Sequence, residues 1–173
     1  MGVCRIPRPR DPASAAQAEV IELLFTYVNK LQVHFEEVAA AHDLSPIQAK
    51  VILSLGQPEP LGCLAQELGC DPSNVTSLVD RLEERGLLTR AGSRDDRRVK
   101  VLEATAAGTQ LRQALSNALF GDVPGMSSLS PAQVSELRRA LGALCGQSIG
   151  EADEGEPPTI VAHGQSPARR HCS

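Results

Sequence analysis

The sequence predicts a mainly α protein with a small β-wing, arranged as a winged helix-turn-helix. A short apolar helix over 61–68 and an amphipathic helix over 72–85 are expected on either side of a turn, and two short strands follow them. Seven Lys or Arg lie between Arg81 and Lys100 against four acids, although the whole chain has a net charge of −4. Such a local excess is typical of a surface that meets nucleic-acid phosphates.

Composition limits the classes of protein that remain. A length of 173 residues predicts one domain with tails, and 42% hydrophobic residues support a core built from aliphatic side chains, since only four residues are aromatic. No apolar run approaches the ~18 residues that a membrane span needs, and the first residues lack the apolar segment of a secretory signal. We therefore expect a cytoplasmic protein with no membrane partner, a disordered arm over 1–13, a domain over 14–148 and a disordered tail over 149–173.

Further helices are expected on both sides of the helix-turn-helix. The segment 14–42 predicts a long helix, and an unbroken apolar stripe on it calls for a partner surface; the stripe comprises Ile21, Leu24, Phe25, Val28, Leu31, Phe35 and Val38. Capping boxes at 45–48 and 130–133 predict the starts of two more helices, and Thr105 begins another. The sequence GQPEP at 56–60 reads as a loop.

The helix over 72–85 has the layout of a helix that enters a DNA groove. Asp71 is its expected N-cap, and Gly86 ends it. Its apolar positions face one way, while small polar residues and one arginine face the other. Small side chains allow close approach to base edges, and arginine reaches guanine or phosphate. The candidate DNA-binding residues on this helix are Ser73, Asn74, Thr76, Ser77 and Arg81.

The expected wing joins strands over 87–90 and 99–102 through the sequence AGSRDDRR. Arg94, Arg97 and Arg98 lie in this tip, interleaved with Asp95 and Asp96. An ordinary solvated turn would explain the charges as weak surface ion pairs. The adjacent helix with its groove-facing layout favours double-stranded DNA as the partner.

The segment DPSNVTSLVDRLEERGLL, followed by DDRRVKVLEATAAG, closely resembles the MarR family of winged-helix repressors. That family combines the pattern SxxTxxVdxLExxGLv with a wing of the form DxRxxxVxLTxxG, and the wing pattern is matched at Asp96, Arg98, Leu102, Thr105 and Gly108. Ala104 departs from it, because the family usually has Leu before the Thr. The resemblance covers about residues 14–148, with the winged helix-turn-helix at about 45–108.

The resemblance implies a sequence-specific, homodimeric repressor on a palindromic operator, with dimerisation helices at about 14–42 and 106–146. It also implies that Arg98 enters the minor groove beside its carboxylate partner Asp96, while Arg94 and Arg97 reach phosphates. Members of the family often release DNA when a small lipophilic acid binds, whereas others respond to cysteine oxidation. Because this chain has one tyrosine, and no cysteine between Cys4 and Cys63, a ligand-responsive or unliganded repressor is favoured over a thiol switch.

Two alternative functions stay open from the sequence. A winged helix can act as a protein-interaction module, and a thiol-based redox-sensing regulator could use Cys63 and Cys70, which lie seven residues apart. An enzyme is not expected, because no glycine-rich phosphate loop follows a strand and no catalytic group is evident. The five cysteines and four histidines are scattered, so we expect neither a metal site nor a cofactor.

Overall fold

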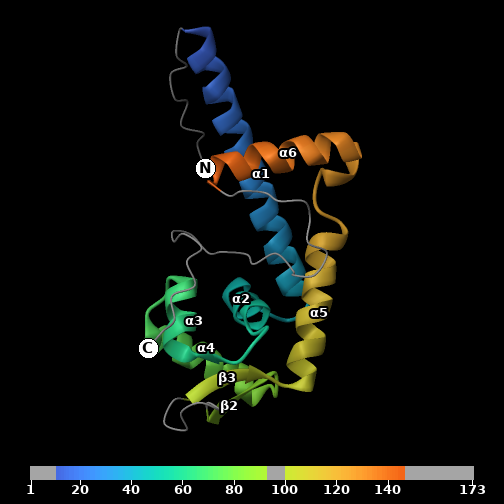
Figure 1. The fold of residues 1–173 in the computed structure, drawn as a ribbon. Coiled ribbons are helices and arrows are strands. Elements are labelled where there is room, and N and C mark those ends of the chain that lie inside the picture. Colours follow the sequence, from blue (N-terminus) through green and yellow to red (C-terminus); the bar gives the residue numbers. More distant parts are fainter. Residues whose placement is uncertain (1–10, 93–99, 147–173) are drawn as a thin grey trace.

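The computed structural model describes residues 11–92 and 100–146, which form helices around a small sheet (Figure 1). The elements, in chain order, are α1 Pro12–Ala41, α2 Pro46–Ser54, β1 Glu59–Pro60, α3 Leu61–Leu68, α4 Pro72–Glu84, β2 Leu88–Gly92, β3 Lys100–Ala104, α5 Ala106–Gly121, the 3-10 helix η1 Met126–Ser128 and α6 Pro131–Leu144. The predicted fold class, mainly α with a β-wing, is confirmed. The arm at 1–10, the wing tip at 93–99 and the tail from 147 onward lie outside the described residues.

Local capping sets where the helices begin. The two predicted capping boxes form: in each, the serine hydroxyl accepts from the glutamine N–H, and the glutamine side chain accepts from the serine N–H, at Ser45–Gln48 and at Ser130–Gln133. A proline follows each serine. The N–H of the first helical residue has no partner within the helix, so proline at this position removes no hydrogen bond. These caps fix the first residues of α2 and α6 independently of tertiary packing.

The sheet has three antiparallel strands in the order β1-β3-β2. In the wing, Leu88 pairs with Ala104 and Gly92 with Lys100, so the described hairpin is five residues long on each side. The segment expected as a loop at 56–60 contributes a strand, because Glu59 and Pro60 pair with Leu102 and Val101. A two-residue strand that contains proline has no alternating hydrophobic pattern from which it could be predicted. β1 forms because β3 supplies its partner strand.

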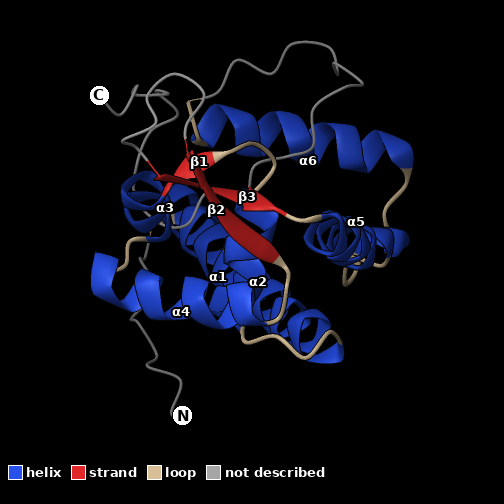
Figure 2. Ribbon diagram, turned by 90° about the horizontal axis from the view of Figure 1, so that it is seen from below, coloured by secondary structure: helices blue, strands red, loops and turns tan. Residues whose placement is uncertain are grey.

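The core lies where α2, α3, α4 and α5 meet the sheet. Its largest fully buried side chains are Val51, Ile52, Leu64, Val75, Val79, Leu82, Leu88, Leu102 and Leu115. Phe35, Val38 and Ala39, near the end of α1, pack against the same cluster. Figure 2 shows the strands between α3 and α5, with α4 along the neighbouring side. The core therefore anchors α4 and the wing to one rigid body.

The two halves of α1 have different surroundings. Its second half joins the core, whereas its first half projects from the end of the molecule opposite the sheet (Figure 1). Four large apolar residues of this projecting half, Val20, Ile21, Leu23 and Phe25, are between 51 and 68% exposed. Among the described residues, the core cluster includes none from this half and none from α6.

The first turn of α5 packs directly against the turn between α4 and β2. The Thr105 hydroxyl donates to the carbonyl of Gly86 at 2.6 Å and accepts from the N–H of Gly108 at 3.1 Å. The Thr105 N–H donates to the carbonyl of Leu87 at 3.1 Å. A Cβ on Gly108 would lie 1.8 Å from the Leu87 oxygen, so only glycine fits there.

Glu59 introduces a carboxylate into the partly buried edge of the sheet. Burial raises the pKa of this carboxyl above its ordinary value of 4.5, and the nearby charge of Glu67 raises it further. Glu67 itself accepts a hydrogen bond from the Ser54 hydroxyl at 3.2 Å. Glu59 therefore holds its proton more tightly in the folded state than in the unfolded chain.

We expect Gly108→Ala to destabilise the fold by about 1–3 kcal/mol or more, because the new methyl group meets a backbone carbonyl that cannot rotate away. Chemical denaturation measures the change. Gly121→Ala is the matched control on the same helix, since no neighbouring heavy atom lies within 4 Å of a Cβ there. Equal stabilities for the two variants would contradict the close approach of α5 to Leu87.

We expect Glu59→Gln to increase the free energy of unfolding at neutral pH. Because the folded-state pKa is raised, the protonated group contributes stability below about pH 4.5, and this contribution is lost as the pH rises through the folded-state value. The gain over the wild type should therefore shrink as the pH falls toward 4.5. Denaturation curves across this range, with Glu136→Gln on α6 as control, measure it; a gain independent of pH would contradict the assignment.

Candidate nucleic-acid interface

α3 and α4 form a helix-turn-helix through a three-residue connection. Gly69 ends α3 in the left-handed region, with φ of 61°, and the Cys70 N–H donates to the carbonyl of Ala65 at 3.0 Å. Asp71 then caps α4, as the sequence predicted. Val75, Val79 and Leu82 are fully buried, so α4 is held by one face and leaves the opposite face to solvent.

The five candidate residues of α4 lie on its outer side and are all exposed: Ser73, Asn74, Thr76, Ser77 and Arg81. The structure thus brings small polar side chains together along the first two turns, with an arginine one turn further on. Their contact with DNA stays a prediction. The arrangement has the shape that a helix in the major groove requires, because no bulky side chain stands between the backbone and the base edges.

The N-cap also orients Ser73. The Asp71 carboxylate accepts from the Ser73 N–H at 2.9 Å and from its hydroxyl at 2.5 Å. These bonds, the one from the hydroxyl foremost, lower the pKa of Asp71 below its ordinary value, so the cap is ionised at neutral pH. Because the Ser73 hydroxyl donates its proton to Asp71, the lone pairs of its oxygen remain available to accept a hydrogen bond from a base amino group.

The arginines around α4 have different partners. Arg85 donates to the carbonyl of Asp43 at 2.9 Å, tying the end of α4 to the turn after α1. Arg90, on β2, pairs with Asp80 and with Glu83. The hydrogen bond to Asp80 is the main cause that raises the pKa of Arg90 above its ordinary value. Of the arginines described between residues 81 and 92, Arg81 alone has no protein partner and can meet a ligand.

The wing carries the remaining candidates. β2 and β3 give the base of the hairpin up to the pair Gly92–Lys100. The predicted tip residues Arg94, Asp96, Arg97 and Arg98 lie outside the described residues, so their positions stay predictions. α4 itself carries Asp80, Glu83 and Glu84 against Arg81, while three of the seven Lys and Arg between residues 81 and 100 lie in the tip.

Two contacts at this surface were not predicted. Asp80, on the exposed side of α4, pairs with Arg90 across the turn to β2. The carbonyl that Arg85 contacts belongs to Asp43, a non-glycine residue with φ of 55°. The spacing of Asp80 and Glu83 on one helix face was the available clue to the first contact; no residue pattern pointed to the second.

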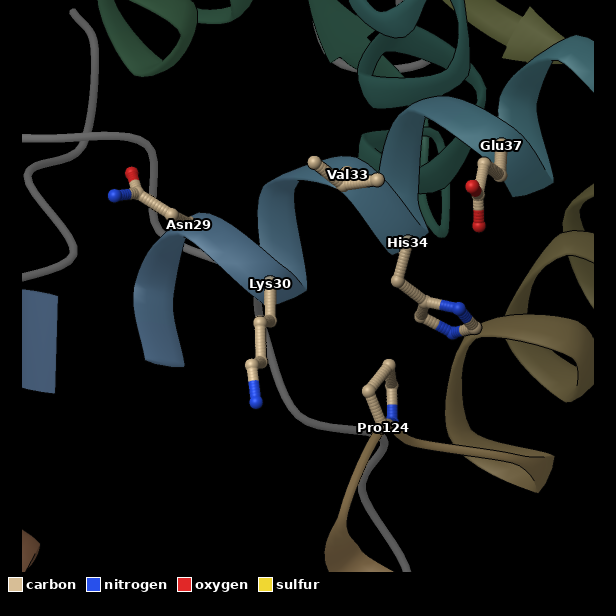
Figure 3. A pocket seen from close by; sticks show the side chains of 6 residues that line it. All are labelled: Asn29, Lys30, Val33, His34, Glu37 and Pro124. Carbon is tan, nitrogen blue, oxygen red and sulfur yellow. The ribbon is translucent and has the colours of Figure 1, made fainter. Parts of the chain in front are cut away.

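A shallow hollow lies beside α1, away from the sheet, and has a volume of about 360 Å³ (Figure 3). Asn29, Lys30, Val33, His34 and Glu37 line it from α1, and Pro124 lines it from the segment after α5. The ring nitrogen Nε2 of His34 lies 3.3 Å from the carbonyl oxygen of Leu119, which links α1 to α5 behind this hollow.

Within 11–92 and 100–146, no group of His, Cys, Asp and Glu side chains is placed to hold a metal ion. Cys70 is a free, partly buried thiol whose hydrogen donates to the Leu68 carbonyl at 3.4 Å. None of the helices in these described ranges is both long and apolar enough to cross a membrane.

Comparison with known proteins gives one consistent match. A family model, described as the MarR family, matches residues 44–100. YhbI of Bacillus subtilis (strain 168), an uncharacterized HTH-type transcriptional regulator, is 32% identical over 114 residues, which span 63% of this chain and 73% of YhbI.

Two solved structures are similar in fold. A mutant MarR from E. coli in complex with operator DNA has 20% sequence identity and a TM-score of 0.57, with 73% of this chain and 93% of that chain covered. CouR from Rhodococcus jostii RHA1, bound to p-coumaroyl-CoA, has 26% identity and a TM-score of 0.57, with 75% and 93% covered. Both likenesses extend beyond the helix-turn-helix to the flanking helices.

Proposed function

This chain belongs to the MarR family of DNA-binding transcriptional regulators, and we propose that it is a homodimeric repressor of a palindromic operator in double-stranded DNA. As a member of this family it is a regulator and not an enzyme. The observation that carries the proposal is the exposed polar face of α4, next to the base of a hairpin whose tip is rich in arginine. We place its action in the cytoplasm, where bacterial operators are found.

In the proposed complex α4 lies in the major groove. Ser73, Asn74, Thr76 and Ser77 approach the base edges, while Arg81 reaches a guanine or a phosphate. Arg98 enters the adjacent minor groove, where the narrow groove concentrates negative potential, and Asp96 orients its guanidinium. Arg94 and Arg97 bind phosphates, which position the protein without reading sequence.

The proposed homodimer rests on the projecting half of α1. Its exposed apolar residues, from Val20 to Phe25, occupy several sides of the helix, so a single flat neighbour cannot cover them. Leu141 and Leu144 of α6 are also exposed, at 37 and 71%. A second copy that interlocks α1 and α6 with these surfaces would bury both sets and hold two α4 helices at one palindrome.

We also propose that a small-molecule effector regulates DNA binding. Support comes from the hollow beside α1, where Lys30 offers a positive charge to an acidic group and Val33 an apolar wall. CouR, at 26% identity, is bound to p-coumaroyl-CoA. A ligand in such a position would contact the helix that joins the dimer to the core, so it could change the spacing of the two α4 helices.

Two alternatives make different predictions. A winged-helix module that binds a protein through apolar contacts would change little with salt, whereas DNA binding weakens steeply as salt rises, because phosphate contacts release counterions. A thiol-based regulator would lose DNA binding on oxidation. Cys70 and Cys145 are free thiols in the described part of the chain, so Cys70 is not paired with Cys63. Because Cys70 lies next to the N-cap of α4, its substitution by serine should abolish such a response.

The wing and helix roles can be separated once an operator has been selected from a random DNA pool. Arg98→Ala should weaken operator binding by about 1–3 kcal/mol per half-site, because it removes a groove contact.

Arg97→Ala should lower the affinity for operator DNA and for random DNA alike, because a phosphate contact carries no sequence information. Arg81→Ala should instead change the sequence that is selected. Fluorescence anisotropy on both DNAs measures these effects. Unchanged affinity of Arg98→Ala for its operator would refute the wing assignment.

A further inference from the structure

Arg90, on β2 of the wing, contacts α4 through both its main chain and its side chain. Its N–H donates to Oε1 of Glu83 at 3.2 Å, and one guanidinium nitrogen, Nη1, donates to the other oxygen of the same carboxylate. The second nitrogen, Nη2, lies 2.5 Å from Oδ1 of Asp80. We call this group of three residues the Arg90 bridge.

The geometry of the bridge suits arginine alone. Asp80 and Glu83 lie three residues apart on α4 and so present their carboxylates on one side of the helix. A planar guanidinium can donate to both at once from separate nitrogens, whereas the single ammonium of lysine is a point charge without that fork. The side chain of Arg90 is 26% exposed, which is less than either partner, so water screens this pair less than an open surface pair.

The bridge spans the turn between α4 and β2. Around that turn, Leu87 and Leu88 are buried and hold the start of the strand to the core. Arg90 lies two residues further along β2, where it fixes the direction in which the strand leaves the core relative to the axis of α4. Because β2 ends at Gly92, this direction sets where the described part of this strand ends.

The acids of the bridge are otherwise hard to explain on a DNA-binding surface. Asp80 and Glu83 bring negative charge close to where phosphates would lie, and on Coulomb's law alone each would weaken binding. Both carboxylates bind Arg90, and this contact gives Asp80 and Glu83 a role on the proposed DNA-binding surface. A salt bridge that only stabilised the fold would not need two carboxylates on α4.

We propose that Arg90 is the positioning residue that sets the wing against α4, so that the hairpin and the helix enter neighbouring grooves of DNA together. This inference rests on the proposed binding of α4 and the wing to DNA. Arg90 acts through the direction of β2, and its own guanidinium is occupied by Asp80 and Glu83 rather than by a phosphate.

The proposal can be tested by whether removing one negative charge from α4 raises or lowers the affinity for the operator. Asp80→Asn removes a negative charge but weakens one arm of the bridge, while Glu84→Gln removes an equal charge from an exposed carboxylate on the same helix that takes no part in it. Simple repulsion predicts that both variants bind the selected operator more tightly. The proposal predicts tighter or unchanged binding for Glu84→Gln, but a loss of about fivefold or more for Asp80→Asn, equivalent to one weakened groove contact.

Hydroxyl-radical footprints identify which contact is lost. Asp80→Asn and Arg90→Lys should lose protection of the minor groove beside each half-site and keep base-specific contacts in the major groove. Circular dichroism and thermal melting show whether both variants remain folded. If Asp80→Asn binds the operator as tightly as the wild type, with the same footprint, the positioning role of Arg90 is overturned. A wild-type chain that protects no DNA would instead overturn the proposed function, and the role of Arg90 with it.

Discussion

The apolar first half of α1 is the constraint on which the rest of this molecule depends. The chain buries the second half of the same helix in its own core but leaves Val20, Ile21, Leu23 and Phe25 exposed. Exposing several large apolar side chains together is costly, since covering each contributes about 1.5–3 kcal/mol. A second copy is the occupant that we propose, because symmetric pairing can cover both copies of this surface at once.

The same helix links the two proposed activities. Phe35, Val38 and Ala39 fix the end of α1 to the core that holds α4, and the bond from Arg85 to the Asp43 carbonyl ties the end of α4 to the turn after α1. These contacts connect the position of α4 to that of α1. The hollow beside Lys30 lies along this path, which is where a ligand would have most influence.

Much of the fold could be predicted because its determinants are local. Capping boxes, N-cap aspartate with proline, and glycine after a helix act within four residues, so the starts of α2, α4 and α6 were readable. Strand β1 depends on a partner strand far along the chain, which no periodicity reveals, whereas the spacing of Asp80 and Glu83 was the available clue to the Arg90 bridge. Gly108 was recognised through a family pattern, but its physical reason, the carbonyl of Leu87, appears only in three dimensions.

The candidate site residues also divide into those that local sequence predicts and those whose partners only the structure shows. The outer face of α4 follows from its 3.6-residue period, and the structure places all five of its candidates in solvent. The pairing of Asp80 with Arg90 changes how that face is understood, since among the arginines described between residues 81 and 92 only Arg81 is left without a protein partner. In the proposed complex the arginines of the tip attract phosphates, while α4 offers an exposed polar face.

Sedimentation of the full chain at micromolar concentration, alone and with its selected operator, tests the central claim most directly. We expect a dimer for the wild type and a folded monomer for Phe25→Glu, because residue 25 is 68% exposed within one chain and the charge disturbs only the interface. Because both copies of Phe25 would be lost from the interface, the dissociation constant of the dimer should rise by roughly 100-fold or more. Gln110→Glu, on an exposed position of α5, should remain dimeric. A wild-type monomer that still binds a palindromic site tightly would contradict the account.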